Sequence, residues 1–160
     1  MKGKKLNDPF FIPVNIKKYF LLGLLLLGGL LAKSQEKSLF VIANKIGAPR
    51  EMKLSELKSV FHGERISWEK GEKIVIAMVK SKSGIGAEIA DKIYNKTPEE
   101  VRGFWAGIVF SGKFDAFYVF NEVNEVESFI AATPGSIAIT DSAVNTASIK
   151  TIIIDGKKSF

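Results

Sequence analysis

The chain has 160 residues, of which 46% are hydrophobic, and it carries a net charge of +6 with no cysteine. The lack of cysteine excludes disulfide bonds, zinc–thiolate sites and cysteine nucleophiles. Six lysines and one aspartate fall in residues 1–34, so residues 35–160 carry a charge of only +1. Because no basic stripe remains there, we expect no nucleic-acid partner.

The N-terminal segment has the pattern of a secretory signal peptide. Basic residues precede an uncharged apolar run, Tyr19–Ala32, of 14 residues. This run is shorter than the ~20 apolar residues that cross a bilayer, and Ala32-Lys33-Ser34 resembles a cleavage site. We therefore predict a signal peptide over 1–34, a single domain over 35–160, and a periplasmic or secreted protein. The alternative is an uncleaved anchor, which would be the chain's only membrane contact.

The first half of the predicted domain contains two strands and a helix. A short β-rich run predicts a strand over Ser38–Ala43. Leu54–Phe61 has helical periodicity, with Ser55 as the expected N-cap and Gly63 as the stop. The apolar run Ile74–Val79 does not alternate with polar residues, which is typical of a strand that is buried on both faces.

Two consecutive helices are expected after that strand. Isoleucines spaced four apart predict a helix that runs from the Lys80–Gly86 turn to about Asn95, with Glu88 in its first turn. Thr97-Pro98-Glu99-Glu100 is a strong helix start, since threonine caps, proline fits the first turn and Glu100 closes a capping box. Gly112 is the expected end of this second helix.

The last third predicts one more helix and two more strands. The aromatic segment Phe114–Phe120 is compatible with either an extended strand or a loop on the core. Asn124 begins the expected helix, Thr133-Pro134-Gly135 breaks it, and strands follow at Ser136–Thr140 and Ile149–Ile154. This alternation indicates an α/β fold with a mainly parallel central sheet flanked by helices.

The turn after the Ile74–Val79 strand is the candidate ligand site. Ligands of open α/β sheets bind at the carboxyl ends of strands, where helix N-termini point their N–H groups at anions. The turn could bind an oxyanion through Lys80, Ser81, Lys82, Ser83, Gly84, Ile85 and Gly86. An ordinary turn with solvated lysines is the competing interpretation, because Glu88 could itself satisfy the helix dipole.

A set of short strings, found in order along the chain, resembles a known family. They are Leu54 to Gly63, Trp68, the Ile74–Val79 strand, Ser83-Gly84, Phe104-Trp105, Phe110 to Lys113, and Thr133 to Ala138. Together they resemble the phosphate-binding proteins of ABC transporters, in the periplasmic-binding-protein-like superfamily. The resemblance covers residues 39–154. It implies a short member that consists of a single lobe of the type II fold.

The resemblance also implies a ligand set that this chain matches only in part. In the family, phosphate lies between two lobes, and one lobe supplies a Ser-Gly-Thr turn with an arginine shortly before it. That turn corresponds to Ser83-Gly84-Ile85, so isoleucine replaces threonine, and Lys80 is the nearest cation. Lysine cannot supply the bidentate fork of arginine. Since residues 35–160 account for one lobe, we expect weak binding.

Other polar residues are interpreted structurally. His62 is the only histidine and follows a helix, so no metal-ligand spacing is present. Glu99-Glu100 and Glu125/Glu127 are expected at helix starts, and Trp68 and Trp105 are expected to pack in the core or at its rim. No cofactor is expected, and without a nucleophile–base pair we expect no enzymatic activity.

Two functions remain open from the sequence. The first is an exported, solute-binding-like protein that binds phosphate or a similar small oxyanion weakly and acts with an ABC permease, a sensor or another envelope protein. The alternative is an envelope protein–protein interaction module that keeps the scaffold of the lobe without its ligand. Exposed aromatic residues between Phe110 and Phe120 would favour the alternative.

Overall fold

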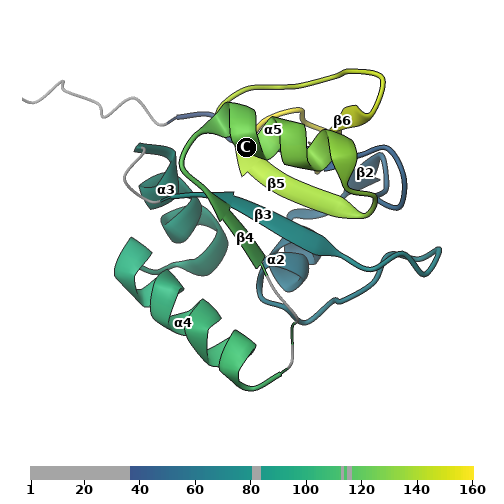
Figure 1. Ribbon diagram of the computed structural model, residues 1–160. Helices are drawn as coiled ribbons and strands as arrows, with labels where there is room; N and C mark the ends of the chain where they lie inside the picture. The colour runs from purple at the N-terminus through teal and green to yellow at the C-terminus, as the bar shows by residue number, and fades with distance from the viewer. Residues whose placement is uncertain (1–36, 81–83, 113, 115–116) are drawn as a thin grey trace, which may run out of the picture. The chain divides into compact units, whose positions relative to one another are not determined.

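The computed structural model describes residues 37–80, 84–112, 114 and 117–160, and within them a six-stranded sheet is covered by helices (Figure 1). The elements in chain order are β1 (Phe40–Asn44), β2 (Glu51–Met52), α2 (Leu54–Phe61), β3 (Val75–Val79), α3 (Gly84–Ile89), the π-helical turn η2 (Ala90–Tyr94), α4 (Pro98–Phe110), β4 (Phe117–Phe120), α5 (Val123–Ala132), β5 (Ser136–Thr140) and β6 (Ile149–Ile154). The predicted α/β class is thus observed.

The sheet is mixed, with the strand order β2-β6-β1-β5-β3-β4. The pairs β3–β4, β3–β5 and β2–β6 are parallel, whereas β1 is antiparallel to both β5 and β6. Parallel pairs are the majority, as expected, and β1 is the exception. Because β3 and β4 are parallel, their carboxyl ends lie at the same edge of the sheet, where α3 and α5 begin.

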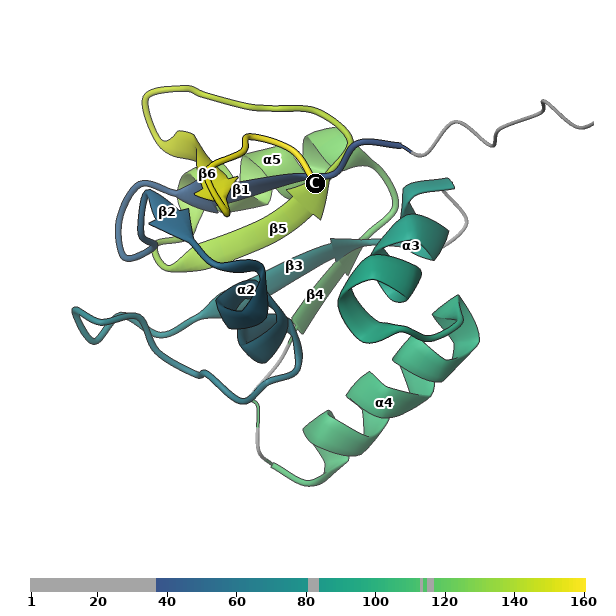
Figure 2. The same cartoon turned by 180° about the vertical axis from the view of Figure 1, so that it is seen from behind.

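Helices cover both faces of the sheet. α5 lies on one face (Figure 1), and α2, α3 and α4 lie on the other (Figure 2). Successive residues of β3 point to opposite faces: Ile76 belongs to the cluster under α2, α3 and α4, and Ala77 belongs to the cluster under α5. Burial on both faces explains why the β3 run shows no polar alternation.

The predicted span Leu54–Phe61 of α2 is confirmed, but its predicted cap and the predicted start of the last helix are wrong by one or two residues. The N-cap of α2 is Lys53 and not Ser55, because the Glu56 carboxylate accepts the backbone N–H of Lys53 at 2.7 Å. α5 begins at Val123 and not at Asn124, because the Glu125 carboxylate accepts the backbone N–H groups of two preceding residues. In both cases a glutamate in the third helical position decides where the helix begins.

The predicted helix boundaries around α4 are confirmed. The backbone N–H of Thr97 donates to Glu100 Oε2 at 2.7 Å, and the N–H of Glu100 donates to Thr97 Oγ1 at 3.3 Å. Gly112, with φ +68°, follows the helix end. The preceding helix is less regular than expected, because α3 changes into η2 and ends at Asn95 in the left-handed conformation.

The aromatic residues divide between core and surface. Trp68 and Trp105 are buried, as predicted. The aromatic segment that the sequence left open between a strand and a loop contains the edge strand β4, whose Tyr118 is half exposed. Phe110, at the end of α4, is 90% exposed. The aromatic residues between Phe110 and Phe120 that the structure describes are therefore partly in the core and partly on the surface.

The two ends of the described domain are hydrogen-bonded to each other. The backbones of Leu39 and Phe160 exchange two hydrogen bonds, of 3.1 and 3.0 Å, and residues 36–160 form one compact unit with its own core. None of the helices that the structure describes is long and apolar enough to cross a membrane. The predicted leader, 1–34, lies outside the described residues and stays a prediction.

Candidate functional site

Lys80 lies where β3 and β4 end together. Its backbone N–H donates to the carbonyl of Phe120 at 2.8 Å, which continues the parallel pairing of the two strands by one residue. Its Nζ donates to Asn121 Oδ1 at 2.7 Å. The ammonium group is therefore held at the carboxyl edge of the sheet, as the sequence predicts for a residue at this end of β3.

The far side of the predicted turn is the start of α3. Gly84 is the first helical residue and is exposed, and Gly86 is partly buried in the first turn. Ile85, which the sequence resemblance aligns with a threonine, is buried and packs in the core. The remaining predicted residues, Ser81, Lys82 and Ser83, lie outside the described residues.

A second cation, Lys37, lies at the start of α3, and the sequence analysis missed it. A Cβ atom built on Gly84 would be 2.9 Å from Lys37 Nζ. Lys37 precedes β1 and is far from Gly84 in sequence, so no local pattern joins the two. A cation beside a helix N-terminus places two positive groups together, an arrangement that a bound anion would relieve.

Glu88 does not neutralise the beginning of α3. No acidic residue falls in the first turn of this helix, and Glu88 Oε1 lies 3.9 Å from the Nζ of Lys92, one turn further on. The expectation that Glu88 lies in the first turn and satisfies the dipole is therefore wrong. Among the described residues, the first turn of α3 therefore contains no carboxylate that would take the place of an anion.

The other polar candidates have structural roles. His62 is the C-cap of α2 and packs its ring against Tyr94 and Phe104, with centroids 5.3 and 5.7 Å away. An ion pair with Arg102 lowers the pKa of Glu99. Hydrogen bonds from Thr97 lower the pKa of Glu100. His62 therefore caps the end of α2, and Glu99 and Glu100 stabilise the first turn of α4.

The comparisons with known proteins show a likeness in fold alone. No family model and no curated protein matches the chain. A structure described as a phosphate ABC transporter substrate-binding protein with bound phosphate, from Clostridium perfringens, aligns with a TM-score of 0.57 at 15% identity, over 76% of this chain and 46% of that chain.

Two further solved structures give the same result. An ABC-type phosphate transport receptor from Vibrio cholerae aligns with a TM-score of 0.56 at 10% identity, over 77% of this chain and 48% of that one. PstS from Borrelia burgdorferi aligns with a TM-score of 0.52 at 18% identity, over 75% and 48%. The aligned region spans about half the length of these structures, and the predicted periplasmic-binding-protein-like fold is confirmed.

Proposed function

We propose that the protein binds a small oxyanion, such as phosphate, weakly at the start of α3. The observation that carries the proposal is the approach of Lys37 Nζ to Gly84 at the N-terminal end of that helix. Lys80 adds a second ammonium group at the carboxyl end of β3. The predicted contribution of Ser81, Lys82 and Ser83 belongs to the same proposal and rests on the sequence alone.

The expected affinity is low. Each charge contact at an exposed helix N-terminus contributes ~0.3–1 kcal/mol. A few such contacts give a total of at most ~4 kcal/mol, which corresponds to a dissociation constant of ~1 mM. Ile85 points into the core and supplies no hydroxyl donor. Tight capture would therefore need a partner protein or a second copy to cover the anion.

The role that we propose is binding without catalysis. The side chains of Lys37, Lys80 and Asn121 at the described part of the site form no nucleophile–base pair, and the two lysines suit an anion. Structures of similar fold include one described with bound phosphate. We infer that the protein is exported and delivers or presents its ligand to an ABC permease, a sensor or another envelope protein.

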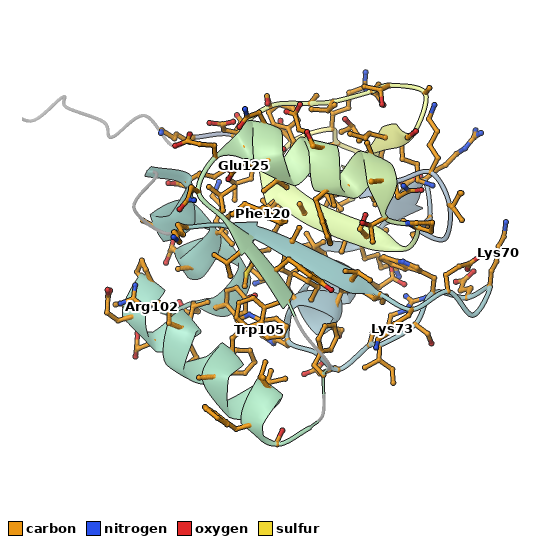
Figure 3. The ribbon with its side chains drawn as sticks, in the orientation of Figure 1. Lys70, Lys73, Arg102, Trp105, Phe120 and Glu125 are labelled. Carbon is orange, nitrogen blue, oxygen red and sulfur yellow. The ribbon has the colours of Figure 1, made fainter. Side chains whose placement is uncertain are left out.

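The test is calorimetric titration of residues 36–160 with phosphate and then sulfate at low salt. We expect saturable binding in the millimolar range. Lys37→Gln should weaken it about twofold to fivefold, the equivalent of one exposed charge contact. Lys70→Gln is the matched control, since Lys70 lies at the opposite end of the molecule from α3 (Figure 3). Equal losses in both variants, or no heat from the unchanged protein, would contradict the proposal.

A second candidate function is protein–protein interaction in the envelope. Exposed apolar side chains at the end of α4 and on the edge strand β4 favour it, above all Phe110, which is 90% exposed. An edge strand also offers unpaired backbone groups to another chain. A photo-crosslinking residue at position 110 should then give one discrete adduct in cells. This candidate replaces the first if that adduct forms and neither anion binds.

A further inference from the structure

A large apolar cavity lies between the sheet and two of the helices that cover it. Its volume is about 440 Å³, within the ~300–1,000 Å³ typical of small-molecule sites. Its walls come from the α4-facing side of β3 and β4, from α3 and η2, and from α4. The principal lining residues are Met78, Phe117, Ile89, Tyr94, Val101 and Trp105.

The floor of the cavity is apolar, although two of its side chains carry polar atoms. Trp105 is fully buried, and its Nε1–H donates to Tyr94 Oη at 2.8 Å. Burial raises the pKa of Tyr94 far above its ordinary value, so this hydroxyl is neutral. Because the two polar atoms are paired with each other, the floor offers mainly carbon surface to a ligand.

The mouth of the cavity lies between α4 and the outer strand of the sheet. Val119 on β4 and Ala106 on α4 both line the cavity and are exposed. Val119 shares the α4-facing side of β4 with Phe117, because side chains two apart along a strand lie on the same face. No strand among the described residues covers this edge of β4, so a ligand can enter there.

The charged residues of the lining are of one sign. Lys80 and Arg102 are exposed cations, and none of the described lining residues is Asp or Glu. Neither cation is isolated: Lys80 Nζ donates to Asn121, and Arg102 Nη2 lies 2.6 Å from Glu99 Oε1. These partners orient the two cations at the mouth. A ligand that is apolar along its body and anionic at one end complements this distribution.

We propose that the cavity binds a medium-chain fatty acid, with its alkyl chain against Trp105 and its carboxylate at the mouth beside Lys80 and Arg102. The apolar body gains free energy by leaving water, and the cations select an acid over a neutral molecule of the same length. The inference goes beyond the proposed oxyanion site and shares Lys80 and Gly86 with it. It requires no residue of 81–83.

The first experiment is calorimetric titration of residues 36–160 with hexanoate, octanoate and decanoate below their micelle concentrations. Affinity should rise about fourfold for each added methylene group, because each one transfers its surface from water to the cavity. Octanol should bind about twofold to fivefold more weakly than octanoate, since it lacks the charge. No binding of any acid, or equal affinity for octanoate and octanol, would overturn the proposal.

Two pairs of variants locate the ligand. Ala106→Trp fills the mouth and should abolish octanoate binding, whereas Val109→Trp, at an exposed position of the same helix outside the lining, should not. Arg102→Gln should weaken octanoate about twofold to fivefold and leave octanol unchanged, and Lys70→Gln should affect neither. Binding that survives Ala106→Trp would place the acid elsewhere and overturn the proposal.

A phosphate titration of the same variants separates the two proposals. The Ala106→Trp variant should bind phosphate as the unchanged protein does, because Ala106 is outside the oxyanion site. Lys37→Gln should weaken phosphate and leave octanoate unchanged. If phosphate fails to bind and octanoate binds, only the oxyanion proposal is lost, and the reverse result removes only the fatty-acid proposal.

Discussion

Trp105 Nε1 donates a hydrogen bond of 2.8 Å to Tyr94 Oη, and both side chains are buried where η2, α4 and the sheet meet. The bond joins two helices that follow each other along the chain (Figure 3 labels Trp105). It satisfies the indole N–H, which would otherwise be an unpaired donor in an apolar environment. The same pair forms the floor of the apolar cavity.

Tyr94→Phe should lower the free energy of unfolding by about 1–3 kcal/mol, because it leaves the buried Trp105 N–H without an acceptor. Tyr118→Phe is the control, since Tyr118 is half exposed on the edge strand. Urea denaturation of both variants measures the difference. Equal stabilities for the two variants would show that the hydrogen bond contributes nothing.

Thr97→Ala should destabilise the protein by about 1 kcal/mol, because it removes the side-chain acceptor at the N-terminus of α4. Ser55→Ala should cause no loss, since Ser55 is exposed inside α2 and Lys53 is the N-cap of that helix. The thermal unfolding midpoints of the two variants compare Thr97, which caps α4, with Ser55, which caps no helix. A loss at Ser55 equal to that at Thr97 would restore the sequence-based assignment.

The capping box of α4 also predicts a loss of stability in acid. Hydrogen bonds from Thr97 lower the pKa of Glu100 below its ordinary value of 4.5, so folding favours the charged carboxylate. The stability that Glu100 adds is therefore present above pH 4.5 and is lost as the pH falls through its folded pKa. Glu100→Gln should remove this part of the pH dependence.

Unfolding in urea at a series of pH values measures that effect. The unchanged protein should lose its advantage over Glu100→Gln as the solution is acidified. Glu127→Gln is the control, because Glu127 lies inside α5, where Glu125 and not Glu127 closes the capping box. A constant difference between Glu100→Gln and the unchanged protein at every pH would contradict this assignment.

Gly135→Ala should destabilise the protein by at least ~2 kcal/mol. Gly135 has φ +76°, and an added Cβ would lie 2.2 Å from the carbonyl oxygen of Lys73. Gly103→Ala should instead stabilise it by about 0.5–1 kcal/mol, since Gly103 is inside α4 with open space around it. Denaturant midpoints of the two variants should therefore move in opposite directions. A loss at both glycines would refute the explanation by local space.

Local chemistry predicts the helices and strands well where one signal acts alone. Thr97 and Glu100 define the start of α4, and β5 and β6 have their predicted bounds. The prediction was wrong where two signals compete. Ser55 is a good N-cap type, but Glu56 closes a box on Lys53, so Lys53 is the N-cap of α2. Single-residue preferences do not include this reciprocal bond.

The candidate site shows a similar division. Lys80 lies at the carboxyl end of a buried strand, as its place after the Ile74–Val79 run predicts. Lys37 could not be found in this way, because it is brought to Gly84 only by the folded arrangement around β1 and α3. The apolar cavity was missed for the same reason, since its lining comes from segments that are separate in the sequence.

By itself the sequence determined the α/β class, the buried strand β3, the boundaries of α4 and the position of Lys80, because each depends on periodicity or on contacts within a few residues. Tertiary structure alone decided the antiparallel placement of β1, the approach of Lys37 to α3 and the cavity beneath α4. These features depend on long-range packing, which local propensity does not specify.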